Sequence, residues 1–386
     1  MKYVCEYSIP LDNQENRQYT VSAVNKASYI IKKINEYGVK VEIVSPTSTK
    51  LNNGFFRKRI DKINKYCILV SGSTFGAKLK IIKYTQRIWQ LVWLFFYLFK
   101  NCKRKEKIFV YHSVFYSPVI LLLLKLKKIE YILEVEEIFF KLEKIKSNSW
   151  RYKLEKALLK NAIAYIFVSN NIENEFNCKR KPFIIISGSY NVNSQLGKLY
   201  KDGKVHLLYA GLIKNDGVIT NILELTKYLS NNYVLHIIGY GDKKDTEMVR
   251  DKIDILKNVI KCKIQYDGLL SGDDYTRYVQ QCHIGICPLK EDKIFQSGCF
   301  PSKITSYLSN GLKVVTTKNY VLQNSIYGNN LIFSVSNSPK NLKEAIEKAQ
   351  NYNQDDSKIL IKKLDLNVTL EMEVFLKKLG IIGDRK

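Results

Sequence analysis

The chain has 386 residues, of which 46% are hydrophobic and 25% are charged; this composition excludes a disordered or low-complexity chain, and the length predicts two domains. The formal net charge is +26 at pH 7 and is concentrated in residues 1–200, with 35 Lys and Arg against 15 Asp and Glu, compared with 27 against 21 in residues 201–386. A first half this basic favours an anionic partner: a nucleic acid, an anionic lipid surface or a phosphorylated substrate.

In the first half, short apolar runs alternate with longer amphipathic segments. The expected strands are residues 2–8, 39–44, 67–71, 108–112, 130–137, 164–169 and 182–187. The expected helices include residues 21–37, 117–128 and 150–161. This alternation predicts a parallel sheet with right-handed crossovers, and so an α/β fold.

Residues 78–107 are unusual because an aromatic, apolar run is enclosed by basic residues. The run IWQLVWLFFYLF follows Arg87 and precedes five Lys and Arg within residues 100–107. About a dozen apolar residues are too few to span a bilayer, which takes roughly 20. Two interpretations stay open: a buried crossover helix, or an interfacial helix that holds the protein on an anionic membrane without a lipid anchor.

Several polar side chains fall where strands of the first half end. His112 ends one expected strand, and Glu134, Glu136 and Glu137 end the next. Ligands of open α/β sheets bind outside the carboxyl ends of strands, so these four are candidate functional residues. The alternatives are a structural histidine and a solvated strand end.

A second series of strands follows a polar, irregular stretch. Its expected strands are residues 205–211, 233–239, 264–268, 284–288 and 313–317. We therefore predict a first domain over 1–190, a linker over 191–204, a second domain over 205–366, and a C-terminal helix over 367–386 that packs back on the first domain.

Residues 300–317, FPSKITSYLSNGLKVVTT, predict a helix followed by a strand. Pro301 suits the first turn, Ser302 is a candidate cap, and Lys303 adds a positive charge there. A helix N-terminus has unpaired N–H groups and a partial positive charge, so it can bind phosphate. The alternative is an ordinary αβ unit.

Other nucleotide and catalytic motifs are weak or absent. Gly239-Tyr240-Gly241 is half of a dinucleotide fingerprint. The sequence contains no P-loop, no G-x-S-x-G and no D-x-D. These absences argue against P-loop ATPases, α/β-hydrolases and enzymes that clamp a diphosphate through a D-x-D-bound metal.

The order of the second-half motifs resembles the donor-binding domain of GT-B glycosyltransferases, in particular family 4 (group 1). The matching pieces are LLYAGLIKNDG, LHIIGYGD, IQYDGLLSGDDYTRYVQQCHIGICPL and FPSKITSYLSNGLKVVTT, which together span residues 207–317. The first half is similar to the family's acceptor domain only through VYHS, EVEE and FIIISGSYN. The resemblance implies two Rossmann-like domains facing across a cleft.

The resemblance also implies roles for particular residues. The implied donor-binding residues are Gly211, Lys214, Gly239, Gly241, Gly268, Pro301, Ser302, Lys303 and Ser306. His112 corresponds to the acceptor-domain histidine that faces the transferred sugar, and Glu136 is the second catalytic candidate. The nucleotide-sugar is a substrate, and neither a cofactor nor a metal is expected.

This sequence departs from the family pattern. The two glutamates usually spaced by eight positions are replaced by Gly298 and Ser306, and the second of them would hold the ribose. Leu212 and Asp216 stand where the family often has Arg and Lys, and the first strand is followed by no glycine pair.

We therefore predict a hexosyltransferase that moves a sugar from a nucleotide-sugar to a lipid-linked or cell-surface glycan precursor, retaining the anomeric configuration. If the enzyme inverts instead, His112 or a glutamate among residues 134–137 would act as general base. The alternatives are a non-catalytic GT-B subunit that activates a partner, a nucleotide-sugar 2-epimerase, and a nucleic-acid-binding protein. No recognised nucleic-acid motif supports the last, so no nucleic-acid partner is expected.

The eight cysteines form no C-x-x-C pair, which predicts reduced thiols rather than a zinc site or disulfides. No signal-peptide pattern is seen at the N-terminus. The predicted location is the cytoplasm, peripheral on the inner, anionic membrane face.

Overall fold

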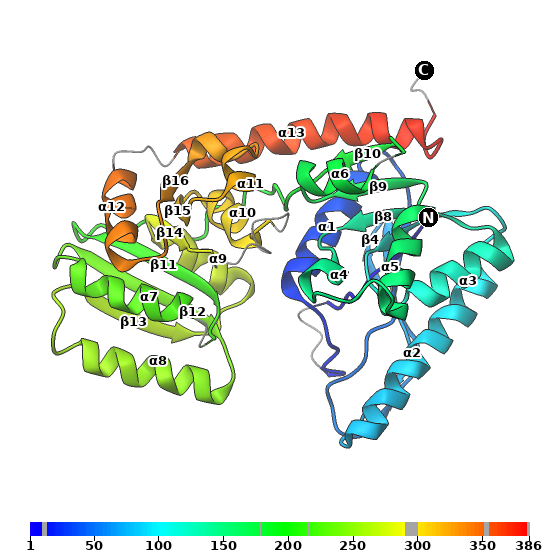
Figure 1. The fold of residues 1–386 in the computed structure, drawn as a ribbon, viewed down its shortest axis with the longest axis horizontal. Helices are drawn as coiled ribbons and strands as arrows, with labels where there is room; N and C mark the ends of the chain where they lie inside the picture. The colour runs from blue at the N-terminus through cyan, green and yellow to red at the C-terminus, as the bar shows by residue number, and fades with distance from the viewer. Residues whose placement is uncertain (10–13, 178, 215–216, 290–299, 351–354, 384–386) are drawn as a thin grey trace. The chain divides into compact units, whose positions relative to one another are not determined.

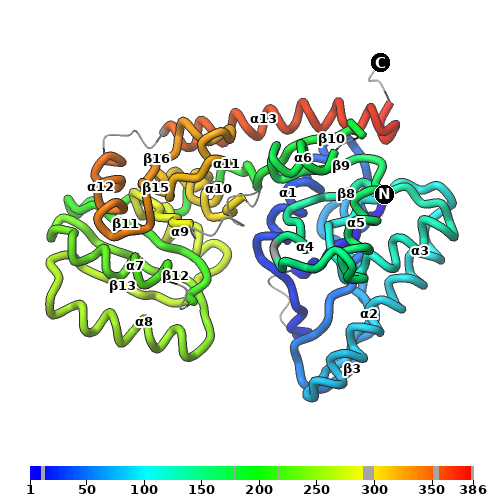
Figure 2. The backbone as a smooth tube through the Cα atoms, in the orientation of Figure 1, coloured from blue at the N-terminus to red at the C-terminus, as the bar shows by residue number. Residues whose placement is uncertain are grey.

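The computed structural model describes residues 1–9, 14–177, 179–214, 217–289, 300–350 and 355–383. The chain forms two compact units: unit 1 comprises residues 1–189 and 368–386, and unit 2 comprises residues 190–367. Figures 1 and 2 trace the chain through both units by colour. Each unit is built on a largely parallel sheet covered by helices, which confirms the predicted α/β class.

Among the described residues, the main sheet of unit 1 has eight strands in the order β10-β9-β8-β7-β1-β2-β5-β4. Its strands are β1 (Lys2–Val4), β2 (Val41–Ser45), β4 (Arg59–Asn64), β5 (Cys67–Ser71), β7 (Lys107–Tyr111), β8 (Glu130–Val135), β9 (Ala164–Phe167) and β10 (Phe183–Ile185). Only β4 runs antiparallel to its neighbour. Strand β1 pairs with both β2 and β7, so the order reverses there.

Helices and a small ribbon complete unit 1. The helices are α1 (Val21–Asn35), α2 (Lys80–Asn101), α3 (Ser117–Lys127), α4 (Phe139–Leu142), α5 (Trp150–Asn161) and α6 (Asn170–Phe176). The ribbon pairs β3 (Phe55–Phe56) with β6 (Thr74–Phe75). Helix α5 starts where predicted because the Ser149 side chain accepts a hydrogen bond from the backbone N–H of Arg151.

The described residues of unit 2 contain a parallel sheet in the order β13-β12-β11-β14-β15-β16. Its strands are β11 (Val205–Leu212), β12 (Tyr233–Tyr240), β13 (Lys263–Gly268), β14 (Ile284–Cys287), β15 (Lys313–Thr317) and β16 (Leu331–Ser334). The order reverses between β11 and β14, as in a dinucleotide-binding fold. The first five strands were predicted, whereas β16 was not.

The helices of unit 2 cover this sheet. They are α7 (Val218–Leu225), η1 (Thr226–Tyr228), α8 (Lys243–Leu256), α9 (Gly272–Gln281), α10 (Ser302–Ser309), α11 (Tyr320–Gln323), η3 (Gly328–Asn330) and α12 (Pro339–Ala349). The core under α7, α8 and α12 is aliphatic and includes Ile222, Leu235 and Ile346.

The segment predicted as a linker packs within unit 2. The backbone N–H groups of Leu196 and Gly197 both donate to Oε1 of Gln280 on α9, at 2.8 and 2.9 Å. A Cβ on Gly197 would lie 2.3 Å from the carbonyl oxygen of Arg277. The division between the units therefore falls at Ser189 and Tyr190.

Helix α13 (Asp355–Lys378) begins in unit 2, and its residues from Val368 onward belong to unit 1. Thr369 accepts hydrogen bonds from Lys33 Nζ at 2.8 Å and, through its carbonyl, from the Tyr37 hydroxyl at 2.6 Å. Lys107 Nζ donates to the carbonyl of Leu379 at 2.7 Å. The predicted return of the C-terminal helix to the first domain is confirmed.

Candidate functional site

In unit 2 the two strands at the reversal point separate before they end. Strands β11 and β14 pair only at Leu207 with Ile284 and at Leu208 with Gly285. Beyond these pairs the backbone N–H of Ala210 donates instead to the Tyr307 hydroxyl, at 2.8 Å. This separation at the carboxyl edge is where ligands of such sheets bind.

Tyr307 holds helix α10 against the sheet. The residue is fully buried, and its ring lies so close to β14 that a Cβ on Gly285 would come within 2.3 Å of it. Burial raises the pKa of the Tyr307 hydroxyl well above its ordinary value. The hydroxyl is therefore neutral and fixes the position of α10 relative to the end of β11.

Glycines occupy the last position but one of both β11 and β12. Gly211 and Gly239 are register partners, and a Cβ on Gly239 would lie 1.8 Å from the carbonyl oxygen of Gly211. A Cβ on Gly241 would lie 2.3 Å from the carbonyl oxygen of Ile213. This edge therefore presents bare backbone, to which a phosphate can approach closely.

Lys303, in the first turn of α10, places its ammonium at this edge. Its Nζ lies 4.2 Å from the centroid of the Tyr209 ring. A Cβ on Gly211 would meet both Cε and Nζ of Lys303 at 2.3 Å, so the lysine side chain lies directly against the glycine. The cation–π contact holds a positive charge beside the bare backbone.

The N-terminus of α10 differs slightly from the prediction. Pro301 is the N-cap rather than a first-turn residue, and the helix begins at Ser302. No described side chain caps it, and Ser302 is exposed. The first-turn N–H of Ile304 donates to the carbonyl of Pro301 at 3.0 Å, whereas the N–H groups of Ser302 and Lys303 have no hydrogen-bond partner among the described residues and stay available to a phosphate.

The remaining predicted donor residues lie around this edge. Lys214 is exposed on the loop after β11, and Gly268 ends β13. Ser306 lies on α10, and its hydroxyl is 3.0 Å from the Tyr275 hydroxyl on α9. Positions 216 and 298, where the sequence departs from the family pattern, lie outside the described residues.

In unit 1, His112 follows β7 at the carboxyl edge of the sheet and is 1% exposed. Its Nδ1 lies 2.8 Å from the carbonyl oxygen of Glu137, so Nδ1 carries the proton. Its Nε2 lies 3.4 Å from Oε1 of Glu155, a buried carboxyl on α5. Burial lowers the pKa of His112 to about 4 and raises that of Glu155 to about 7.

Glu134 and Glu136 are brought together beside it. Glu134 is fully buried, and the Tyr3 hydroxyl donates to its Oε2. Burial, and then the neighbouring Glu136, raise the pKa of Glu134. Glu136 forms an ion pair with the buried Lys26 of α1. The carboxyls of Glu134 and Glu136 are thus both engaged by other side chains of the protein. The catalytic roles of His112 and Glu136 stay predictions.

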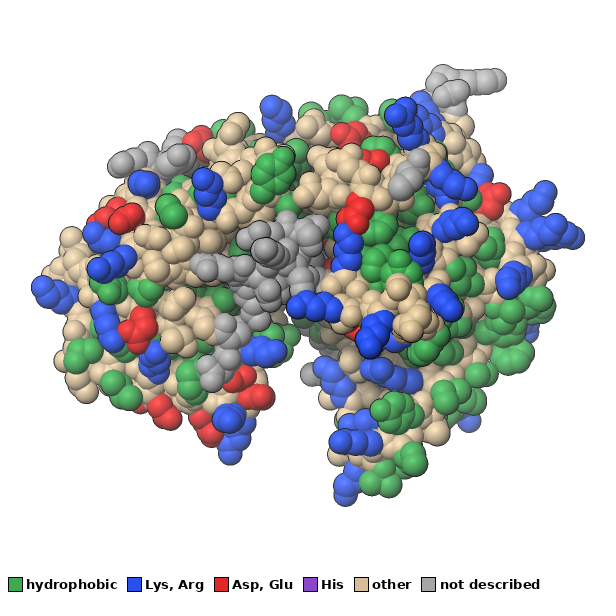
Figure 3. All heavy atoms as spheres, in the orientation of Figure 1, with side chains coloured by type: hydrophobic (Ala, Val, Ile, Leu, Met, Phe, Trp, Pro, Cys, Tyr) green, Lys and Arg blue, Asp and Glu red, His purple; other side chains and the backbone are tan. Residues whose placement is uncertain are grey.

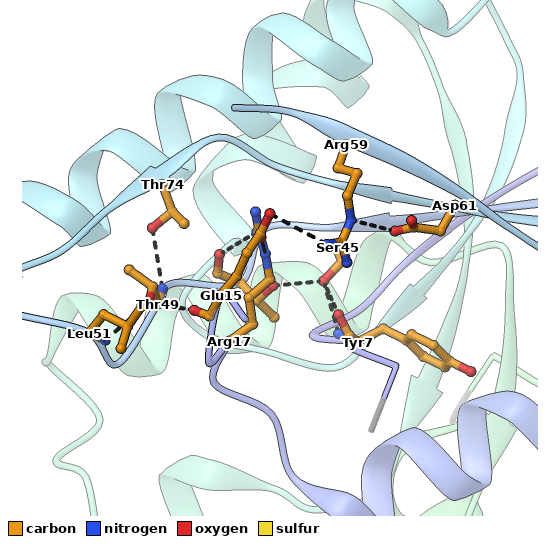
Figure 4. Close-up of polar contacts among 10 residues, drawn as sticks. Tyr7, Glu15, Arg17, Ser45, Thr49, Leu51, Arg59, Asp61 and Thr74 are labelled. Atoms are coloured by element: carbon orange, nitrogen blue, oxygen red, sulfur yellow. Dashed lines mark hydrogen bonds and ion pairs between the residues drawn. The ribbon is translucent and has the colours of Figure 1, made fainter. Parts of the chain in front are cut away.

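The loops that follow β1 and β2 are joined by the network of Figure 4. Ser45 Oγ donates to the carbonyl of Tyr7 at 2.6 Å and accepts from its N–H at 3.0 Å. The buried Arg17 pairs with Glu15 at 2.5 Å and donates to the carbonyl of Thr47 at 3.1 Å. The two loops are therefore held in one arrangement.

A cavity of about 80 Å³ lies beside this network. It is lined by Glu6, Gln18, Ser48, Arg87, Gln90 and Phe115. Arg87 lies 5.8 Å from the centre of the Phe115 ring, and burial raises the pKa of Glu6. Gln90 is 5% exposed, and its amide has no hydrogen-bond partner among the described residues. The cavity is below the usual size of ligand pockets, so it fits only a small polar group.

The sequence did not identify several of these residues. Tyr209 and Tyr307 lie within the matched motif pieces but were given no role, and Glu155 lies in none of them. A buried aromatic or a helical glutamate has the same local pattern whether or not it supports a site. The cavity joins segments far apart in the chain, and only the basic, aromatic run that contains Arg87 drew attention to one of them.

Two further features do not add to the site. A larger hollow of about 730 Å³, between α7 and α8, is lined by charged residues of both signs and contains none of the predicted residues. Among the described residues, no group of three or more His, Cys, Asp or Glu is placed to hold a metal ion.

No protein-family model matches the chain, and no curated protein matches its sequence. Solved structures do match. The UDP-forming α,α-trehalose-phosphate synthase from Burkholderia xenovorans in complex with glucose-6-phosphate is 9% identical, with 98% of this chain and 99% of that chain covered and a TM-score of 0.63. The catalytic domain of starch synthase IV from Arabidopsis thaliana, bound to ADP and acarbose, is 9% identical, with 98% of each chain covered and a TM-score of 0.63.

A third match is the lipopolysaccharide outer core galactosyltransferase WaaB in its apo form, at 11% identity. It covers 96% of this chain and 99% of that chain, with a TM-score of 0.57. These similarities span nearly whole chains and confirm the predicted GT-B fold. At such low identity, membership of family 4 stays a prediction.

Proposed function

We propose that this chain is a glycosyltransferase of the hexosyltransferase class, resembling family 4, which transfers a sugar from a nucleotide-sugar donor. The observation that carries the proposal is the placement of Lys303 against Gly211, at the point where β11 and β14 separate. A lysine ammonium, uncapped helix N–H groups and bare glycine backbone converge there. Together they form a site for a diphosphate.

The chemical task at this site is to stabilise a departing nucleoside diphosphate. Lys303 and the first turn of α10 supply positive charge where negative charge develops on the leaving group. The donor residues are those predicted: Gly211, Lys214, Gly239, Gly241, Gly268, Pro301, Ser302, Lys303 and Ser306. In support, the starch synthase that shares this fold is bound to ADP.

Unit 1 is proposed to bind the acceptor, a lipid-linked or cell-surface glycan precursor, at the membrane face of the cytoplasm. The Glu6 carboxyl and the Arg87 guanidinium at its cavity suit a hydroxyl-rich or phosphorylated group. His112 and Glu136 are the catalytic candidates, and retention of configuration is proposed from the family resemblance. In support, the trehalose-phosphate synthase of this fold is in complex with glucose-6-phosphate, a phosphorylated sugar.

The test is a binding screen of the whole chain against UDP-, GDP-, ADP-, CMP- and dTDP-linked sugars, followed by a transfer assay with the donor that binds. We expect one nucleotide class to raise the melting temperature. Lys303→Gln should weaken its binding about 10- to 100-fold, as for a lost charged hydrogen bond. Lys243→Gln is the matched control, because Lys243 is 90% exposed at the start of α8. Equal binding by both variants would contradict the assigned site.

A second candidate is a non-catalytic GT-B subunit that activates a partner enzyme. It is favoured by Ser306, which stands where the family has a ribose-binding glutamate and whose hydroxyl is paired with Tyr275. A uniform failure of all nucleotide-sugars to bind would select this candidate. Conversion of the donor without transfer would instead indicate an epimerase.

A further inference from the structure

Helix α2 buries one face against the protein and exposes apolar residues on the opposite face. The face toward the protein is a row spaced by four residues: Gln86, Gln90, Leu94 and Leu98. At 100° per residue, the opposite face comprises Ile81, Tyr84, Ile88, Val92, Phe96 and Phe99. Each of these six is exposed over 41–73% of its surface. A helix that served only as a crossover would not leave such a row uncovered.

Helix α3 extends this apolar surface. Lys127 on α3 donates to the carbonyl of Cys102 at 2.6 Å, just past the end of α2, and lies 4.9 Å from the Phe99 ring. Leu122 and Leu126 are exposed on α3. We name these two leucines and the six exposed α2 residues the α2–α3 face; in Figure 3, hydrophobic side chains gather over both helices among basic ones.

The charge around this face has one sign. Residues 78–128 contain twelve Lys and Arg but a single acidic residue, Glu106, which is paired with Lys2 at 2.9 Å. Lys78, Lys80 and Lys83 lie at one end of α2, and residues 100–105 supply four more cations at the other. The face therefore complements an anionic surface at both ends of the helix.

We propose that the α2–α3 face seats unit 1 on an anionic lipid bilayer, with α2 lying in the interface. Exposed aromatic and aliphatic side chains with basic flanks are the pattern of interfacial helices. A second copy of the chain fits less well, because a twofold contact would place the same cations opposite one another. No described helix is long and apolar enough to cross the membrane, which agrees with a helix that lies on it.

The same helix lines the cavity of unit 1. Arg87 and Gln90 project from α2 into that cavity, while Ile88 lies on the exposed row. A bilayer that contacts the α2–α3 face would therefore lie along α2, the helix whose Arg87 lines the cavity of unit 1. This step rests on the proposed function, since it gives a lipid-linked acceptor a route to the cavity with its tail still in the membrane.

The test is co-sedimentation of the whole chain with vesicles of phosphatidylcholine alone, and of equal parts phosphatidylcholine and phosphatidylglycerol. We expect binding to the anionic vesicles only, weakened by salt, with a blue shift of the tryptophan fluorescence. The double variant I88S/F96S should weaken binding at least tenfold. The matched control I255S/V259S removes two residues of unit 2 that are 68% and 67% exposed, and it should bind as the parent does.

The inference would be overturned if I88S/F96S bound anionic vesicles as tightly as the parent does. It would also be overturned if the parent bound neutral vesicles as tightly as anionic ones. A parent dimer that I88S/F96S abolishes, without vesicle binding, would assign the face to a second copy instead. If the parent binds RNA but does not bind vesicles, the face would be assigned to nucleic acid instead. Nucleotide-sugar binding is measured on the same proteins, so failure of the proposed function is seen separately.

Discussion

The Tyr307 hydroxyl accepts the hydrogen bond that the backbone N–H of Ala210 would otherwise give to a neighbouring strand. The bond is 2.8 Å long and buried, and it lies where β11 and β14 cease to pair. One side chain thus both opens the carboxyl edge of the unit 2 sheet and fixes α10 there. The position of Lys303 therefore depends on a residue that touches no ligand.

We predict that Tyr307→Phe destabilises unit 2 by about 1–3 kcal/mol, because it leaves the Ala210 N–H buried without an acceptor. Hydrogen exchange of the peptide that contains β11 measures the loss. Tyr320→Phe is the control, since Tyr320 is 73% exposed and should change stability by less than about 0.5 kcal/mol. Unchanged protection of β11 in Tyr307→Phe would contradict the role assigned to this bond.

Two glycine variants should test the backbone at the strand ends of unit 2. In Gly211→Ala the new methyl group meets the flexible end of Lys303 at 2.3 Å, and the residue must hold a φ of +155°, which alanine rarely adopts. Nucleotide binding should therefore fall about tenfold, and unit 2 should also lose about 1–3 kcal/mol of stability. In Gly239→Ala the methyl group meets the Gly211 carbonyl at 1.8 Å, which is backbone, so unit 2 loses about 2–3 kcal/mol or more. Calorimetric unfolding and nucleotide titration measure both effects, with Gly383→Ala as a control that contacts nothing within 4 Å.

The sequence predicts elements best where local signals end them. The helix at 150–161 has its serine cap, and the strands at 67–71 and 313–317 are short β-branched or apolar runs; all three have the predicted bounds. The first strand was predicted over 2–8 but ends at Val4, because β2 and β7 pair with it only that far. Strand length is set by partners that a single segment does not reveal.

The same distinction applies to the sites. The glycines lie at the strand ends that they serve, and Lys303 lies in the first turn of a predicted helix, so motif order predicted them. The pairing of His112 with Glu155 joins β7 to α5, and neither residue has a local pattern that indicates the other. The exposure of the α2 residues of the α2–α3 face depends on whether another part of the fold covers them. The sequence of the helix does not contain that information, so two interpretations stayed open.

The buried His112–Glu155 pair should make the stability of unit 1 depend on pH in two opposite ways. The pKa of Glu155 is raised to about 7, so its stabilising contribution is complete below about pH 4.3 and is lost as the pH rises through 7. Glu155→Gln should remove that loss, which amounts to at most about 4 kcal/mol. Urea unfolding followed by tryptophan fluorescence reports unit 1, because Trp89, Trp93 and Trp150 all lie in it.

The control for this pair is Glu130→Gln, a carboxyl 40% exposed in its ion pair with Lys107. It should leave the pH dependence as in the parent. His112 acts with the opposite sign, since its lowered pKa means that unit 1 loses stability as the pH falls from 6.5 toward 4. If the free energy of unfolding changes with pH between 4.5 and 7 by the same slope in Glu155→Gln and in the parent, the raised pKa of Glu155 is refuted.

In unit 2 a buried histidine pair should make the free energy of unfolding fall as the pH falls. His206 Nδ1 lies 2.8 Å from His236 Nε2, and His236 Nδ1 lies 2.7 Å from the Tyr278 hydroxyl. Burial, and then His206, lower the pKa of His236 to about 4, so its contribution is present above pH 6.5 and is lost as the pH falls toward 4. His236→Gln keeps hydrogen-bonding groups but cannot titrate, so hydrogen exchange of β12, corrected for its intrinsic rate, should vary less between pH 7 and 4.5 than in the parent. A variant as acid-sensitive as the parent would show that the loss arises elsewhere in unit 2.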